Sequence, residues 1–331
     1  MPNDTTQNAK AWVGFDLGGT KMLAAVFDRK LSVTGRCKRN TKAFLGPATG
    51  LERIVRTIRE ALADAQCDAG DVGAIGIGCP GLVDPDNGIL LDPANLGWRD
   101  LPVRKPLEKE FGCPVVVAND VDAGVYGEYA EGAARKARCA LGVFPGTGIG
   151  GGCVYEGRIL TGSGRSCLEL GHMQVVPGGA RCGCGQRGCL ETVASRLAIS
   201  AEAVKAAFRG QAPHLVERCG MDLSEVRSGD LAAAIAAGDR EIERIVRDAA
   251  AWLGLGLANV VNLLAPDVVV LGGGLVEAMP KLYLQQVEST ARKRVMSSLA
   301  HAFKVVVSAL GDNAVVVGAA AWARDRTGGT A

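Results

Sequence analysis

The order of apolar and polar positions along the chain predicts short strands that alternate with helices. Runs rich in β-branched, aromatic and other apolar residues predict buried strands at 11–17, 22–28, 73–78 and 114–120. Residues 51–66 instead space their apolar side chains along one helical face. Because strands alternate with helices, the pattern predicts the α/β class.

The second half of the chain follows the same plan. Residues 139–160 predict a strand, a glycine turn and a second strand, as residues 11–28 do. A long helix is predicted from about Arg240 to Leu264, and Pro266 stops it because proline cannot continue a helix. A strand, a glycine turn, another strand and a helix complete the chain. For 331 residues, this repeated plan predicts two lobes.

Composition and charge exclude several classes of protein. The formal net charge is +2, so neither nucleic acid nor a membrane surface is predicted as a partner. The polar residues 1–10 lack the apolar segment of a signal peptide. The most apolar stretch, 253–275, is interrupted by polar residues and proline, which predicts buried elements and no membrane span. Eleven cysteines, an odd number found mostly in apolar runs, indicate reduced thiols and a cytoplasmic protein.

Three glycine-rich turns follow predicted strands. The first, residues 18–21, differs from a Walker A motif because threonine precedes lysine and a strand follows. The second, 146–151, matches G-x-G-x-x-G, but the dinucleotide-binding motif requires a helix next, and a strand-like run follows here. The third, 271–275, ends another buried strand. Each turn alone is equally compatible with a purely structural role.

Together the three turns favour binding of a nucleotide's phosphates. Glycine lets backbone N–H groups approach phosphate oxygens closely, and Thr20 and Thr147 add hydroxyl donors. Two such hairpins facing each other would hold the phosphate tail between two lobes. The predicted cofactor-binding residues are Asp16, Gly18, Gly19, Thr20, Lys21, Gly146, Thr147, Gly148, Gly150, Gly273 and Gly274.

Seven motifs in order along the chain carry a family resemblance. DLGGTK, CPGLVD, AND, GTGIGGG, ELGH, CGCGQRGCLE and LGGG together resemble the ROK family of bacterial sugar kinases, repressors and uncharacterised open reading frames. The resemblance covers about residues 11–325, and the cysteine motif is its most specific part. It implies a two-lobed actin/hexokinase-like (ribonuclease H-like) ATPase fold with an interlobe cleft and an inserted zinc-binding loop.

The resemblance also implies lobes, ligands and an assembly. The smaller lobe is expected at 11–118 with about 312–331, and the larger at 119–311, with the zinc loop at 172–189. ATP and Mg²⁺ are the implied cosubstrates, structural Zn²⁺ the implied bound metal and a hexose the implied acceptor. A homodimer is the implied assembly.

The cysteine cluster poses a choice between a catalytic metal, a structural metal and a redox pair. His172, Cys182, Cys184 and Cys189 offer one imidazole and three thiolates, a closed tetrahedral set suited to zinc. A closed set favours a structural site, because catalytic zinc keeps an open position. Members of the family use the matching positions in this way, and a redox pair among the three cysteines is the alternative.

Sugar ligands are predicted around this loop. Glu169 and Glu191 flank it, and family members use the matching glutamates and the histidine to hydrogen-bond sugar hydroxyls, which suits carboxylate acceptors. Ordinary surface charge is the alternative. The predicted substrate-binding residues are Gly81, Asn119, Asp120, Glu169, His172 and Glu191.

Asp120 is the candidate catalytic base. It ends a buried strand at a predicted helix start, where α/β clefts open, and its alternative role is to cap that helix. In the family the matching aspartate accepts the proton of the sugar hydroxyl. Val121 and Asp122 depart from the Ala-Asn that many members carry, which leaves the role of Asp122 open.

Weaker assignments concern common residue types. Asp16 is expected to hold magnesium through water, and Lys21 to contact phosphate. Asn95 and Trp98 resemble the segment that flanks the sugar in glucose-using members, and Trp98 is equally compatible with a core or a lid position.

The sequence thus predicts ATP-dependent phosphorylation of a hexose at its 6-hydroxyl. Glucose is the leading substrate, followed by N-acetylmannosamine and N-acetylglucosamine and then fructose. The sequence does not show whether the pocket accepts a 2-hydroxyl or a 2-acetamido group. A non-catalytic ROK regulator is the alternative of another class. Such regulators carry a helix-turn-helix domain ahead of the first hairpin, and about ten polar residues precede it here.

Overall fold

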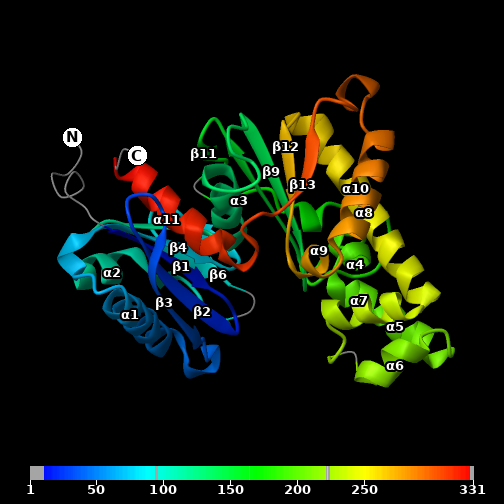
Figure 1. Cartoon of the computed structure of the whole chain (residues 1–331), viewed down its shortest axis with the longest axis horizontal. Coiled ribbons are helices and arrows are strands. Elements are labelled where there is room, and N and C mark those ends of the chain that lie inside the picture. Colours follow the sequence, from blue (N-terminus) through cyan, green and yellow to red (C-terminus); the bar gives the residue numbers. More distant parts are fainter. Residues whose placement is uncertain (1–10, 94–95, 164, 221, 223, 329–331) are drawn as a thin grey trace. The chain divides into compact units, whose positions relative to one another are not determined.

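The computed structural model describes residues 11–93, 96–163, 165–220, 222 and 224–328. Within these residues the strands form two five-stranded sheets and one three-stranded sheet, with helices between them along the chain (Figure 1). The predicted α/β class is therefore confirmed. No helix among the described residues is long and apolar enough to cross a membrane.

The chain divides into two compact units. The described residues of Met1–Lys136, Gly152–Cys167 and Asp312–Ala331 make up unit 1. Those of Ala137–Gly151 and Leu168–Gly311 make up unit 2, which is therefore inserted into the sequence of unit 1.

The sheet of unit 1 has the strand order β3-β2-β1-β4-β8. The predicted hairpin is present, with β1 and β2 antiparallel, whereas β1, β4 and β8 run parallel. The carboxyl ends of these three parallel strands therefore meet at one edge of the sheet. The strands are β1 (Ala11–Leu17), β2 (Lys21–Phe27), β3 (Val33–Asn40), β4 (Val72–Cys79) and β8 (Val115–Asn119).

Two helices cover this sheet on opposite faces, α1 (Pro47–Asp64) and α11 (Ala314–Arg326) (Figure 1). Helix α11 approaches β1, β4 and α3 (Asp120–Ala130) so closely that side chains are excluded at the contacts. A Cβ atom built on Gly14 would lie 1.9 Å from the carbonyl oxygen of Val316. A Cβ on Gly318 would lie 1.7 Å from the carbonyl oxygen of Ala123. Glycine is therefore required where these backbones touch.

Gly318→Ala is expected to destabilise the protein by roughly 1–3 kcal/mol, because α11 and α3 must separate to admit the methyl group. Urea denaturation of the variant and of Gly70→Ala measures this. Gly70 is the matched control, since a Cβ there meets no atom within 4 Å. Equal stabilities of the two variants would contradict the close contact.

The predicted lobe boundary at residues 118–119 stays a prediction. In the structure α3 lies in unit 1, where it packs on α11 and where Tyr126 Oη donates a hydrogen bond to Asp325 Oδ2 over 2.7 Å. Burial raises the pKa of Tyr126, and the bond to the Asp325 carboxylate raises it further. The phenol therefore stays a donor that ties α3 to α11.

A small sheet in unit 1 was not predicted from the sequence. Its strands are β5 (Leu82–Asp84), β6 (Ile89–Asp92) and β7 (Leu101–Pro102), and α2 (Arg104–Phe111) follows. Beside it, Trp98 is 2% exposed, donates from Nε1 to the carbonyl of Ala43 over 3.1 Å and packs on Gly50. Trp98 is thus a core residue, and Asn95 lies outside the described residues.

The second five-stranded sheet has the order β11-β10-β9-β12-β13. Its strands are β9 (Cys139–Pro145), β10 (Ile149–Tyr155), β11 (Arg158–Ile159), β12 (Val268–Leu271) and β13 (Lys304–Val307). The prediction of a single strand after the glycine turn within 139–160 is wrong, because residues 153–160 belong to two strands, β10 and β11. The chain reverses at Glu156 and Gly157, whose positive φ angles of 48° and 76° form a two-residue hairpin turn.

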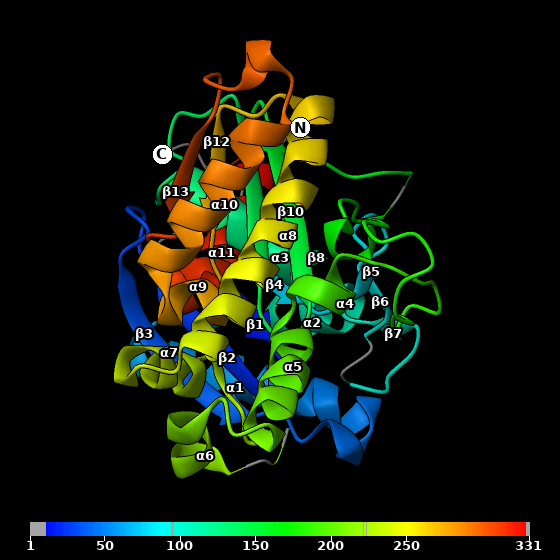
Figure 2. The same cartoon turned by 90° about the vertical axis from the view of Figure 1, so that its right-hand side faces the viewer.

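Unit 2 contains the larger share of helices. The predicted long helix is present as α8, and α10 packs on α8 and on β13 (Figure 2). The helices of unit 2 are α4 (Glu191–Ala194), α5 (Arg196–Phe208), α6 (Pro213–Cys219), α7 (Ser228–Ala237), α8 (Arg240–Leu264), α9 (Gly274–Ala278) and α10 (Pro280–Arg294). Single 3₁₀ turns occur at Ala43–Leu45, Ala69–Asp71, Leu170–His172, Ser297–Leu299 and Gly311–Asn313.

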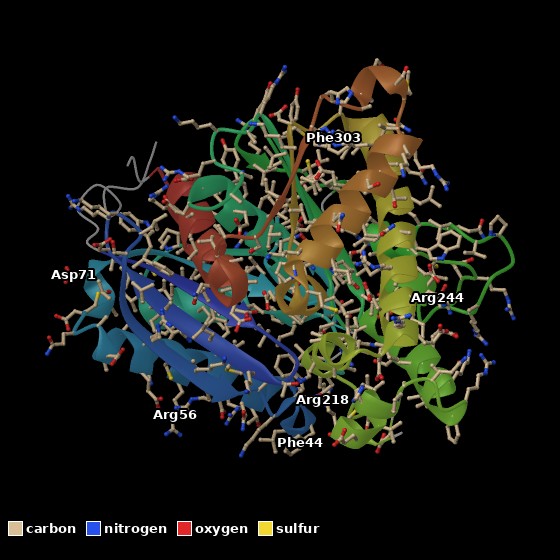
Figure 3. All side chains as sticks on the ribbon, turned by 45° about the vertical axis from the view of Figure 1, so that its right-hand side comes forward. Phe44, Arg56, Asp71, Arg218, Arg244 and Phe303 are labelled. Atoms are coloured by element: carbon tan, nitrogen blue, oxygen red, sulfur yellow. The ribbon has the colours of Figure 1, made fainter. Side chains whose placement is uncertain are left out.

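The outer face of α8 is polar. Arg244 projects from this helix (Figure 3), and it pairs with Glu241 at 2.7 Å and with Asp248 at 2.5 Å. A hollow of about 280 Å³ lies beside it, lined partly by Trp252 and by α5. None of the predicted site residues lines this hollow, so it is not the predicted site.

Candidate active site

The carboxyl edge of the unit 1 sheet brings the predicted acids together. Asp16 lies at the end of β1 opposite Gly78, and Asn119 lies at the end of β8 opposite Cys79 of the strand between them. Gly78 carries no side chain that could separate the two ends, and Asp120 is the next residue after β8. The Asp120 carboxylate is close enough to raise the pKa of Asp16. Burial raises the pKa of the Cys79 thiol, and both carboxylates raise it further.

Asn119, not Asp120, is the N-cap of α3, so the predicted capping role of Asp120 is corrected. Asn119 Oδ1 accepts from the backbone N–H groups of Val121 at 2.8 Å and Asp122 at 3.2 Å. Its Nδ2 donates to the carbonyl of Gly81 over 3.0 Å. Asn is as good a cap as Asp, and Asp120 Oδ1 accepts from the N–H of Val121 as well, over 2.9 Å. This bond thus brings Gly81, which lies between β4 and β5, next to Asn119 and Asp120, so that three of the predicted substrate residues lie together.

Asp16 is in an unusual electrostatic environment. Its pKa is raised from 3.8 to about 7, mainly by burial and further by the nearby carboxylates of Asp120 and Asp312. Asp312 was not singled out from the sequence, because it lies in the 3₁₀ turn before α11, and only the fold places it beside β1. Carboxylate oxygens are the ligands that Mg²⁺ prefers, and a divalent cation would relieve the repulsion among these three acids.

Asp16→Asn is expected to stabilise the folded protein in magnesium-free buffer by roughly 1–4 kcal/mol at pH 8, and by less at pH 5. The folded protein keeps the Asp16 proton up to about pH 7, whereas the unfolded chain loses it near 3.8. The wild type therefore loses stability as pH rises between these values, and the variant does not. Urea denaturation at the two pH values measures the difference. A gain that does not change with pH would contradict the raised pKa.

Asp122 lies behind the site. Its side chain is 2% exposed and its Oδ1 lies near Gly152, where a Cβ would come within 2.9 Å. Together with Asn119 and Trp322 it lines a cavity of about 30 Å³. This volume holds a water molecule and no sugar, so this cavity is not a sugar site.

The first glycine turn is held by a residue that the sequence did not reveal. Buried Thr41 donates from Oγ1 to the carbonyl of Gly18 over 2.6 Å, and its backbone N–H donates to the carbonyl of Thr20 over 2.8 Å. Thr20 and Lys21 are exposed, and Gly18 and Gly19 are half-buried. The carbonyls of this turn are therefore occupied, while its side-chain donors face outward.

The second and third glycine turns come together in unit 2. The second is tight, with the N–H of Gly146 donating to the carbonyl of Gly148 over 2.8 Å. Gly273 has a φ of 80°, and a Cβ there would lie 2.8 Å from the carbonyl oxygen of Pro145. Gly274 begins α9, whereas Gly150 lies in β10 and outside the turn.

The cysteine cluster is assembled as predicted. The ligand atoms of His172, Cys182, Cys184 and Cys189 all lie within 4.8 Å of one another. His172 Nδ1 lies 3.6 Å from Cys182 Sγ, and Cys184 Sγ lies 3.7 Å from Cys189 Sγ. Ligands at about 2.1–2.3 Å from a tetrahedral zinc ion are separated by roughly 3.5–3.8 Å, so the four residues fit zinc. No disulfide joins any of the described cysteines, and 3.7 Å is far longer than the ~2 Å of a disulfide.

Glu191 connects this cluster to the second glycine turn. Its Oε2 accepts from the backbone N–H of Ile149 over 3.1 Å, and its Oε1 lies 3.8 Å from Cys182 Sγ. A Cβ on Gly148 would lie 2.3 Å from Oε2, so a side chain at this position would displace the carboxylate. Glu169 is exposed, and its carbonyl accepts from the N–H of His172 over 2.9 Å.

The predicted site residues therefore form two groups, each inside one unit. Unit 1 holds the first glycine turn, the acids and Asn119, whereas unit 2 holds the other glycine turns, the cysteine cluster and the two glutamates. The prediction that both groups face one cleft stays a prediction.

Comparison with known proteins identifies relatives over almost the whole chain. Residues 12–326 match the profile of the ROK family. The glucokinase of Halalkalibacterium halodurans is 32% identical over 311 residues, which cover 93% of this chain and 93% of that enzyme. The xylose repressor of Bacillus subtilis is 30% identical over 248 residues, 74% of this chain and 60% of the repressor. The crystal structure of a ROK family glucokinase from Streptomyces griseus, in complex with glucose and AMPPNP, has a TM-score of 0.82 and 31% identity, covering 95% of this chain and 99% of that one.

Proposed function

Because the chain belongs to the ROK family, we propose that it is an ATP-dependent hexose kinase that phosphorylates the 6-hydroxyl of its sugar. Glucose is the first substrate to test, since the curated relative that matches over 93% of both chains is a glucokinase. The transfer forms a bond between the 6-oxygen of the sugar and the γ-phosphorus of ATP. It breaks the bond between that phosphorus and the oxygen that bridges it to the β-phosphorus, and ADP leaves.

The position of Asp120 is the observation that carries the proposal. Its carboxylate follows a buried strand at the edge where three parallel strands end, and the Asn119 cap fixes its backbone. In this role Asp120 accepts the proton of the attacking hydroxyl. Phosphoryl transfer has a loose transition state, so a correctly placed carboxylate of ordinary basicity suffices.

The remaining residues supply charge and shape. Asp16 and Asp312 would hold Mg²⁺, which neutralises phosphate charge when bound. The glycine turns at 18–21 and 146–148 would present N–H and hydroxyl donors to the phosphates. Glu169 and His172 would accept and donate hydrogen bonds to sugar hydroxyls.

The cysteine cluster has a structural role in this proposal. Four protein ligands leave zinc no open position, so the metal would hold the loop at 172–189 in shape. The loop in turn positions Glu169 and Glu191, which flank it.

The test is release of ADP from magnesium-ATP by the purified protein with glucose, N-acetylmannosamine, N-acetylglucosamine, fructose or no sugar. We expect sugar-dependent release that is strongest with glucose, because turnover requires the base, the phosphate turns and the sugar together. Strongest release with another sugar of the panel would reassign the substrate and keep the reaction. Sugar binding without ADP release would place the chain with the non-catalytic members of the family.

A further inference from the structure

Arg196 lies against the second glycine turn at the start of α5. Its Nη2 donates to Thr147 Oγ1 over 3.0 Å, and its Nη1 donates to the carbonyl of Val226 over 3.0 Å. Its backbone N–H donates to the carbonyl of Gly146 over 2.8 Å. The two side-chain bonds hold the guanidinium in place beside the turn at 146–148, and the backbone bond joins the start of α5 to this turn.

Positive charge gathers around this guanidinium. Within the part of the chain that the structure describes, Arg196 forms no ion pair with an acidic side chain, and the first turn of α5 contains no acid. The N-terminal end of α5, a helix of 13 residues, adds the partial positive charge of its dipole. Burial lowers the pKa of Arg196, and the neighbouring Arg227 guanidinium lowers it further. This arrangement is stabilised when an anion binds.

Glu191 does not balance the charge at Arg196 through an ion pair. Its carboxylate contacts the same turn from the side of Gly148 and accepts from the N–H of Ile149. The side of Gly146 is open, because a Cβ there would meet no atom within 4 Å, and Thr147 is exposed. An anionic ligand therefore has room on the side of the turn where the guanidinium lies.

We propose that Arg196 binds phosphate oxygens of the phosphoryl donor at the turn 146–148. The inference rests on the proposed kinase function and gives this turn the cation that its own sequence, Gly-Thr-Gly, lacks. A guanidinium has five N–H donors, and the bonds to Thr147 and Val226 use two of them. The remaining donors suit a bidentate contact with phosphate.

The experiment measures binding of ADP and of adenosine, with magnesium present, to the full chain by isothermal titration calorimetry. Arg196→Met is expected to weaken ADP binding about 10- to 100-fold, as the loss of charge-assisted hydrogen bonds does, and to leave adenosine binding unchanged. Arg209→Met is the matched control, because it removes the same charge from the exposed C-terminal end of the same helix. Arg196→Lys should fall between the wild type and Arg196→Met.

The salt dependence separates phosphate binding from mere support of Thr147. If Arg196 contacts phosphate, the ADP affinity of Arg196→Met falls less steeply with added salt than that of the wild type and of Arg209→Met. Equal salt dependence, or ADP and adenosine binding weakened alike, would overturn the proposal. So would an ADP dissociation constant of Arg196→Met within twofold of the wild type.

The same preparations distinguish this inference from the proposed function. Sugar phosphorylation by the wild type, with ADP affinity unaffected in Arg196→Met, overturns the role of Arg196 and leaves the kinase in place. If Arg196→Met loses ADP affinity but the wild type phosphorylates no sugar, the phosphate site is supported and the kinase proposal is overturned. A wild type that binds no ADP overturns both.

Discussion

Asp120→Asn is expected to lower kcat roughly 1000-fold while the sugar dissociation constant changes by less than about threefold. The amide keeps the shape and a carbonyl acceptor, but it cannot take up the proton of the sugar hydroxyl. The backbone of residue 120 should hold its place, because the Asn119 side chain caps α3 independently of residue 120.

Steady-state kinetics and sugar titration by tryptophan fluorescence measure the two quantities separately. Asp86→Asn, an exposed position in the same unit, is the matched control and should retain wild-type kcat. A kcat for Asp120→Asn within tenfold of the wild type would remove Asp120 from the role of base. Asp16 and Asp312, the other two acids at this edge of the sheet, would then be the candidates for the base.

Cys184→Ser is expected to weaken zinc binding at least 100-fold and to raise the KM for the sugar about 10- to 100-fold. A serine hydroxyl is a poor zinc ligand at neutral pH, and three ligands do not hold the loop closed. Because Glu191 bonds to Ile149 and also lies against Cys182, the KM for ATP should rise as well. Zinc loss is thus expected to affect both substrates.

Zinc content by mass spectrometry and the two KM values measure these effects. Cys219→Ser is the matched control in the same unit, because Cys219 lies outside the cluster and its thiol bonds to the carbonyl of Leu215, which a serine can also do. Full zinc occupancy with wild-type KM values in Cys184→Ser would contradict the scaffold role. A change in the sugar KM alone would contradict the link through Glu191.

Local patterns predicted the elements whose signals are local. The β1–β2 hairpin and α8 appear where alternation, helical periodicity and Pro266 place them, because strand and helix periods are properties of short windows. The cysteine cluster was also predictable, since three of its four ligands lie within eight residues. The break of 153–160 into two strands was missed, because Glu156 adopts a positive φ that its residue type does not signal.

Residues that act through distant contacts could not be predicted in this way. Asp312 reaches Asp16 only because α11 packs on β1, and Arg196 reaches Thr147 across 49 residues of sequence. Thr41 supports the first glycine turn from the end of β3. Each is a common residue in an ordinary local context, and its function arises from which backbone it meets in the fold.

The contact between α3 and α11 has a consequence for synthesis on the ribosome. Tyr126 and Asp325 lie 199 residues apart, and all of unit 2 is translated between them. At roughly 5–20 residues per second, α3 waits about 10–40 s for the helix that covers its glycine-containing face, and β1 and β4, which are translated earlier, wait longer. During that interval these apolar surfaces are exposed to chaperones and to other nascent chains. The inserted unit can complete its own fold first, and the polypeptide that is made first is among the last to reach its native packing.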